Sequence, residues 1–174
     1  MRCFIGIDLS ALNKRAIEQW ASANWPEITS SKPVPASNYH LTLLFIGQVN
    51  QAQQEQLITC VDKLIMRPFQ VRLNQTGCWH KPPIAYLTDK HPEQVLLELQ
   101  SNIEATIKEL VVPDLHTHSA YRPHVTLARK FRHVAPQPKD NFSFAQEVTH
   151  IHLFESVSGP HGVSYPIRHS WPLG

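Results

Sequence analysis

Two short segments of this chain repeat one arrangement of polar side chains. HLTL at residues 40–43 and HVTL at residues 124–127 each hold a histidine and a threonine two residues apart, with an aliphatic residue after each. Because side chains alternate between the two faces of a β-strand, the histidine and the threonine share one face and the aliphatic residues share the other. The copies lie in different halves of the chain, which predicts two similar lobes that each offer one histidine and one threonine.

The residue types in this repeat suit acid–base chemistry at phosphorus. Histidine titrates near neutral pH without special perturbation, so one ring can act as a base while another acts as an acid. In an in-line displacement, either His40 or His124 would deprotonate the attacking water, and the other would protonate the departing oxygen. Thr42 and Thr126 can donate hydrogen bonds to phosphate oxygens, and Arg129 adds a charged donor. A lone strand histidine is usually structural, but the pairing favours a functional site.

Composition narrows the class of protein further. The net charge of +2 over 174 residues is too small for a protein that coats nucleic acid, but it suits the binding of one small anion. The three cysteines lack a CxxC pair, so we expect reduced thiols in a cytoplasmic protein. No signal peptide or membrane-length apolar run is visible. Basic residues gather around the second motif, in a stretch without acids: Arg122, Arg129, Lys130, Arg132 and Lys139.

Hydrophobic periodicity predicts an α+β architecture built mainly from antiparallel strands. We expect helices over residues 10–23, 50–66 and 92–112, of which the last has the clearest apolar stripe. We expect strands over residues 2–9, 39–46, 69–79, 84–88, 123–128, 142–156 and 163–168. Because no flexible linker interrupts this order, we expect one two-lobed domain spanning residues 1–174, with one motif in each lobe.

The motifs also carry a resemblance to a known family. The strings HLTLLFIG at residues 40–47 and YRPHVTLAR at residues 121–129 resemble the two-histidine phosphoesterase superfamily, in particular its RNA 2′,3′-cyclic phosphodiesterases, once called 2′-5′ RNA ligases. The resemblance implies a bilobal fold of two antiparallel sheets, related by a pseudo-twofold, with helices outside and a central cleft between the histidines. It also implies opening of a cyclic phosphate to a 2′-phosphomonoester without a metal or cofactor, with reversible 2′-5′ joining as a side activity.

The resemblance assigns roles to individual residues. His40 matches the first motif histidine, taken as the acid toward the leaving O3′, and His124 matches the second, taken as the base for water. The sequence leaves these two roles interchangeable. Thr42 and Thr126 match the phosphate-binding threonines. Arg129 matches a basic residue that closes the second motif, and Phe45 matches an aromatic residue near the substrate. Arg122 is expected to face the cleft, and Tyr121 is expected to stack on the terminal base.

Two other classes of function compete with this interpretation. A metallohydrolase would use His116 and His118, or His150 and His152, but no HExxH motif or neighbouring carboxylate supports a zinc site. A non-enzymatic module would hold RNA ends in the cleft, but the common RNA-binding signatures are missing and binding alone does not require two histidines. A serine or cysteine nucleophile is disfavoured because the sequence has no GxSxG elbow.

The motifs do not distinguish among substrates within the superfamily. Its members act on tRNA-splicing intermediates, ADP-ribose cyclic phosphate or 2′-5′ oligonucleotides. The expected partners are therefore RNA ends with a 2′,3′-cyclic phosphate, such as tRNA fragments, or small cyclic nucleotides. Specificity would lie in loops 26–37 and 133–139, and the expected form is a monomer without membrane contact. The tryptophans are expected in the core or at its rim: Trp20, Trp25, Trp79 and Trp171.

Overall fold

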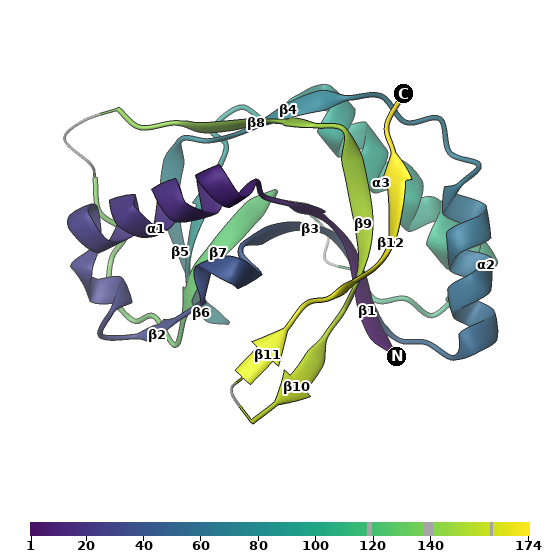
Figure 1. The fold of residues 1–174 in the computed structure, drawn as a ribbon, viewed down its shortest axis with the longest axis horizontal. Helices are drawn as coiled ribbons and strands as arrows, with labels where there is room; N and C mark the ends of the chain where they lie inside the picture. Colours follow the sequence, from purple (N-terminus) through teal and green to yellow (C-terminus); the bar gives the residue numbers. More distant parts are fainter. Residues whose placement is uncertain (118–119, 138–140, 161) are drawn as a thin grey trace.

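The computed structural model describes residues 1–117, 120–137, 141–160 and 162–174, and it confirms the bilobal α+β class (Figure 1). Within these ranges the helices are α1 (Ala11–Asn24), α2 (Gln51–Val61) and α3 (Gln94–Leu110), with 3-10 turns at Pro26–Ile28 and Ala36–Asn38. The strands are β1 (Arg2–Asp8), β2 (Lys32–Pro33), β3 (His40–Gln48), β4 (Phe69–Leu73), β5 (Gln75–His80), β6 (Pro83–Thr88), β7 (His124–Arg129), β8 (Phe144–Val148), β9 (His150–Glu155), β10 (Val157–Gly159), β11 (Gly162–Ser164) and β12 (Ile167–Pro172).

Two helices begin at the caps expected from the sequence. The Ser10 hydroxyl accepts the N–H of Asn13 at 3.1 Å at the start of α1. At the start of α2, the side chain of Asn50 accepts the N–H of Gln53 at 2.8 Å, and the side chain of Gln53 accepts the N–H of Asn50 at 3.0 Å. This reciprocal capping box satisfies two N–H groups that a helix start leaves without partners. Helix α2 is shorter than expected, because a turn follows Val61.

One path of hydrogen-bonded strands runs through both lobes. Its order is β12-β9-β1-β3-β7-β6-β5, with β2 added to β7, and every pairing along it is antiparallel. Strands β12, β9, β1 and β3 form one half-sheet, and β7, β6 and β5 form the other. Strands β3 and β7, all of whose residues are described, pair with each other at one residue pair, Leu41 with Val125. The two predicted sheets are therefore halves of one sheet that meet at a single pair, which we call the seam.

Three of the predicted strands are divided. Residues 163–168 fall on β11 and β12, and the other two divisions interlock the lobes. The strand expected over residues 69–79 breaks at Asn74 into β4 and β5, and the one expected over 142–156 breaks at Thr149 into β8 and β9. Strands β4 and β8 pair with each other in a separate ladder, while β5 and β9 belong to opposite half-sheets. A strand that serves two sheets must turn between them. At the first break the turn is held by the side chain of Asn74, which accepts the N–H of Lys90 at 2.9 Å.

The helices cover the outer sides of the two half-sheets (Figure 1). Helices α2 and α3 pack against each other beside β1, β9 and β12, while α1 runs along the half that holds β5 and β7. The aliphatic residues of both motifs enter the core, where Leu41 is 1% exposed and Val125 is fully buried. None of the described helices is long and apolar enough to cross a membrane.

Close packing beside the first motif generates a test of the fold. Gly6 on β1 lies opposite Thr42, and a Cβ atom at Gly6 would lie 2.8 Å from the carbonyl oxygen of Leu41. Because backbone and not a flexible side chain must move, Gly6→Ala should lower the free energy of unfolding by about 1–3 kcal/mol in urea denaturation. Gly159→Ala is the matched control, since its added Cβ would lie 3.7 Å from the nearest atom. Equal losses in the two variants would contradict this account.

Candidate active site

Strands β3 and β7 present their motifs in the same way. Along both strands the first six residues are in turn half-buried, buried, half-buried, buried, buried and exposed. His40 and Thr42 therefore share one face of β3, and His124 and Thr126 share one face of β7, while the aliphatic residues point into the core. The alternation predicted from the sequence is confirmed in both copies.

A β-bulge follows the threonine in each motif and explains the two successive buried residues. The pairing of β1 with β3 skips Leu43, and the pairing of β6 with β7 skips Leu127. An extra residue of this kind reverses the alternation of the strand beyond it. Phe45 and Arg129, each five residues after a motif histidine, therefore return to the histidine face instead of the core face. Their exposure agrees, because Phe45 is 63% exposed and Arg129 is also exposed.

The seam relates the two motifs by the predicted pseudo-twofold. Leu41 and Val125, which each follow a motif histidine, are direct partners across it. In antiparallel pairing this directs both histidine faces to the same side, with His40 toward Thr126 and His124 toward Thr42. The imidazoles are close enough that a positive charge on His124 lowers the pKa of His40. The structure thus brings the four motif side chains to one face.

Backbone carbonyls orient both imidazole rings identically. Nδ1 of His40 lies 2.7 Å from the carbonyl oxygen of Asn38, and Nδ1 of His124 lies 2.8 Å from that of Arg122. A carbonyl oxygen only accepts, so each Nδ1 carries a hydrogen and each Nε2 is left for chemistry. In His40 this Nε2 lies 3.1 Å from the Thr42 hydroxyl, which donates to it. Both rings therefore offer the same nitrogen, fixed by the residue two positions earlier.

Aromatic side chains wall both histidines. The ring centre of His40 lies 4.7 Å from that of Phe4 and 4.9 Å from that of Tyr165. The ring of His124 lies 4.7 Å from Trp79 and 5.6 Å from Tyr86. The sequence predicts Trp79 only in the core or at its rim, and it does not predict these aromatic contacts. The missing signal is the cross-strand register, which sets Tyr86 opposite Thr126 and Phe4 opposite Phe45.

Burial between these walls changes the acid–base properties of both rings. Loss of hydration lowers the pKa of His40 from 6.5 to about 4, although the Asn38 carbonyl and the Asp8 carboxylate act in the opposite direction. Burial also lowers the pKa of His124, against the effect of the Arg122 carbonyl. Desolvation disfavours the charged form of an imidazole. At neutral pH, both rings are therefore neutral in the unliganded protein.

Tyr121 has a different place from the one predicted. Instead of offering its ring to a terminal base, it packs against the core, and its hydroxyl donates to the carbonyl oxygen of Thr42 at 3.0 Å. Burial raises the pKa of this phenol, so it stays a donor. Tyr121 lies just before β7 and Thr42 lies on β3, so this bond ties the two motif strands together. Arg122 is exposed, and the contact shown for it is that of its carbonyl oxygen with His124.

The histidines considered for a metal site lie elsewhere. His116 is exposed after α3, and His118 lies outside the described residues, as does Lys139 of the second predicted specificity loop. His150 and His152 lie on β9 with parallel rings 6.3 Å apart, and Nδ1 of His152 lies 2.8 Å from the Ser170 hydroxyl. Among the described residues, no three His, Cys, Asp or Glu side chains are grouped to hold a metal ion. The described residues therefore offer no ligand set that would support a metallohydrolase.

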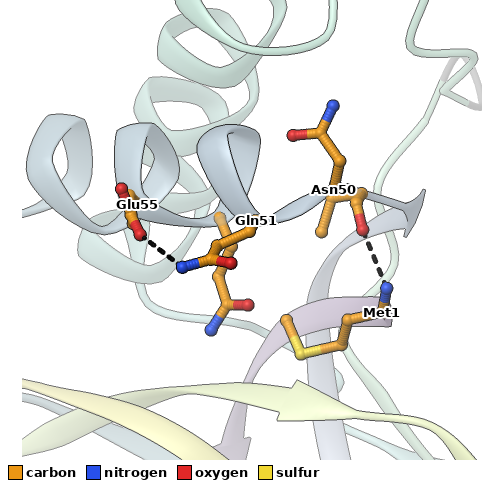
Figure 2. Close-up of a pocket in the computed structure, with 6 residues that line it drawn as sticks. Met1, Asn50, Gln51 and Glu55 are labelled. Carbon is orange, nitrogen blue, oxygen red and sulfur yellow. Dashed lines mark hydrogen bonds between the residues drawn. The ribbon is translucent and has the colours of Figure 1, made fainter.

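Two pockets among the described residues differ in how they relate to the predicted site. A pocket of about 250 Å³ lies beside His40 and is also lined by Asp8, Lys14, Phe154 and Tyr165, among others. A larger one, of about 410 Å³, lies at the start of α2, where the Met1 amino group donates to the carbonyl of Val49 (Figure 2). Its described lining includes none of the predicted site residues. His40 is the predicted site residue that lines the smaller pocket, whereas His124, Thr42 and Thr126 are not part of its lining, so this pocket lies to one side of the paired motifs.

Comparison with known proteins agrees with this geometry. RNA 2′,3′-cyclic phosphodiesterase of Escherichia coli is 25% identical over 172 residues, covering 99% of this chain and 96% of the relative. The enzyme of that name from Thermus thermophilus is 27% identical over 150 residues, covering 82% of this chain and 75% of the relative. The crystal structure of E. coli LigT complexed with 3′-AMP matches with a TM-score of 0.90 at 25% identity, covering 99% and 97% of the two chains.

A second solved structure and a family model give the same assignment. A crystal structure described as a phosphoesterase matches with a TM-score of 0.88 at 26% identity and covers 99% of this chain and 98% of its own. The model of the 2′-5′ RNA ligase superfamily matches residues 10–159, a range that includes both histidine–threonine motifs. The fold, the paired motifs and these matches together show that the chain belongs to the 2′-5′ RNA ligase superfamily.

Proposed function

We propose that this protein is a phosphodiesterase that opens the terminal 2′,3′-cyclic phosphate of RNA to a 2′-phosphomonoester. The observation that carries the proposal is the pair of imidazoles that offer Nε2 from one face, each with a threonine two residues along its strand. Relatives named RNA 2′,3′-cyclic phosphodiesterase from bacteria and archaea support it. Hydrolysis of ADP-ribose cyclic phosphate or 2′-5′ oligonucleotides is the alternative within the superfamily.

In the proposed reaction each histidine moves one proton. Nε2 of His124 takes a proton from water, whose oxygen attacks phosphorus. The bond from phosphorus to O3′ breaks, and O3′ takes a proton from Nε2 of His40. Thr42 and Thr126 donate hydrogen bonds to the non-bridging oxygens, and Arg129 offsets their charge. The reaction consumes one water and leaves the phosphate on O2′, and the same displacement with a 5′-hydroxyl in place of water gives a 2′-5′ diester.

Substrate binding supplies the protonation state that the free protein lacks. Both histidines are neutral at pH 7 before binding, because burial lowers the pKa of each ring. An anionic phosphodiester between them favours the charged form and raises both pKa values. One ring can then hold the extra proton while the other stays neutral. The Asp8 carboxylate acts on His40 in the same direction, against the burial that lowers the pKa of this ring.

The proposed partners follow from the surfaces around the motifs. Phe45 is exposed on the His40 face, and Trp79 stands beside His124, so a nucleobase has an aromatic surface on either side of the phosphate. We propose RNA ends, including tRNA fragments, or small cyclic nucleotides as substrates, acted on by one two-lobed unit. A monomeric form and a cytoplasmic location stay predictions from the sequence.

The central experiment follows the fate of an RNA oligonucleotide ending in a 2′,3′-cyclic phosphate, in the presence of EDTA. We expect turnover, with the 2′-monoester identified by ³¹P NMR. His40→Ala and His124→Ala should each reduce kcat by about 10²- to 10⁴-fold, because a proton transfer is lost, while affinity for the end largely survives. His150→Ala is the matched control, since this histidine is exposed on β9. Loss of turnover in EDTA, a 3′-monoester product, or active histidine variants would refute the proposal.

The rate should depend on pH through both histidines. One ring must be protonated and the other neutral in the complex, so kcat should pass through a maximum and fall on both sides. Each single histidine variant should lose one limb of this bell in steady-state measurements of its residual activity. A wild-type profile with a single limb would show that only one of the two rings titrates in the reaction.

The buried His40 ring should also make folding stability depend on pH. Its pKa is about 4 in the folded protein against 6.5 for an ordinary histidine, so between these values the unfolded chain binds the proton more readily. Stability should therefore fall as the pH is lowered from 6.5 to 4, by up to about 3 kcal/mol. His40→Gln should lose this part of the dependence in urea unfolding at a series of pH values. Identical pH dependence in the two proteins would contradict the assigned burial effect.

A further inference from the structure

The two motif histidines differ most clearly in the residue that faces each of them on the neighbouring strand. Asp8 on β1 is the cross-strand partner of His40, whereas Thr88 on β6 is that of His124. The Thr88 hydroxyl is engaged with the carbonyl of Pro123, to which it donates at 2.6 Å. Directly paired residues of antiparallel strands bring their side chains together on one face. His40 thus has a carboxylate neighbour at the position where His124 has a hydroxyl.

Asp8 is in turn paired with a lysine from another element. Nζ of Lys14, on α1, lies 2.6 Å from Oδ1 of Asp8, and it also donates to the carbonyl of Ser37 at 3.2 Å. The side chains are 18% and 35% exposed for Lys14 and Asp8, so the pair is partly withdrawn from water. Gln146 fixes the backbone between them, because its side chain donates to the carbonyl of Asp8 and accepts the N–H of Ser10. The geometry of the pair is therefore held from three elements.

The pair and His40 face the same pocket. Asp8, Lys14 and His40 all line the 250 Å³ pocket, together with the aromatic rings of Phe154 and Tyr165. Charges interact more strongly beside such low-dielectric walls than in open water. The other titratable groups near His40 are His124 on β7 and Tyr165, whose ring centre lies 4.9 Å from that of His40. His152 on β9 lies opposite Gly6 of β1 and is itself influenced by Asp8. Asp8 is thus the anionic group acting on His40, and Lys14 opposes it.

We propose that Asp8 and Lys14 are positioning residues that set how readily His40 holds a second proton, Asp8 favouring the imidazolium and Lys14 restraining it. In the unliganded protein Lys14 acts against Asp8, and burial keeps the ring of His40 neutral. When a phosphate anion binds between the motifs, Asp8 makes protonation of His40 easier than it would be without this carboxylate. The catalytic role of Asp8 and Lys14 rests on the proposed function, whereas their effect on the protonation of His40 does not.

The coupling is tested directly by NMR titration of the His40 ring in the unliganded protein, with ¹³C,¹⁵N-labelled histidine and His40→Gln to assign the signal. Asp8→Asn should shift the His40 titration to lower pH and Lys14→Met should shift it to higher pH, each by about one pH unit. Lys108→Met is the matched control, since it removes a lysine whose Nζ lies 2.7 Å from Glu104 on α3. Shifts in opposite directions, absent in the control, support the proposal. Shifts of the same sign, no shift, or an equal shift in the control overturn it.

Activity then separates this inference from the proposed function. With a cyclic-phosphate RNA, the alkaline limb of kcat should move down in Asp8→Asn and up in Lys14→Met, while KM changes less than kcat. A merely structural role would lower activity without moving the limbs in opposite directions. If the wild-type protein does not turn over this substrate, the proposed function fails, but the NMR titration still decides whether Asp8 and Lys14 control His40.

Discussion

The antiparallel pairing of Leu41 with Val125 is the constraint on which the geometry of the site depends. Each of these residues follows a motif histidine, so one pair of buried aliphatic side chains sets the register and the direction of both motifs. A slip of one residue on either strand would turn its histidine into the core and an aliphatic residue outward. The packing of the core therefore enforces the convergence of the polar faces. Tyr121 adds a second tie between the same strands.

The aromatic walls and the carbonyl contacts act together on the histidines. Burial against rings such as Phe4 and Trp79 removes water and keeps the imidazoles neutral. The carbonyls of Asn38 and Arg122 satisfy Nδ1, so this burial leaves no unpaired donor there. In such a site an incoming anion meets oriented donors and little competing solvent. Both rings are neutral until the substrate binds, and its negative charge then favours a second proton on one of them.

Much of the fold and the central site follow from local patterns in the sequence. The alternation of the motifs, the helix caps at Ser10 and Asn50 and the apolar stripe of α3 are set by neighbours in the chain, so they were predictable. The aromatic walls, the Asp8–Lys14 pair and the place of Tyr121 depend on which strands become neighbours. The bulges at Leu43 and Leu127 also depend on pairing, and they move Phe45 and Arg129 to the active face. Strict alternation would place both on the wrong side.

The division of strands at Asn74 and Thr149 has a consequence for how the protein is made. The half-sheet that holds His40 is assembled from segments far apart in the sequence, as in the pairing of β1 with β9. Such long-range pairing is slow compared with local folding, and it waits for the later segment to be synthesised. Both motif histidines are therefore synthesised while the half-sheet that holds His40 still lacks β9 and β12. The catalytic pair matures only after the C-terminal strands emerge.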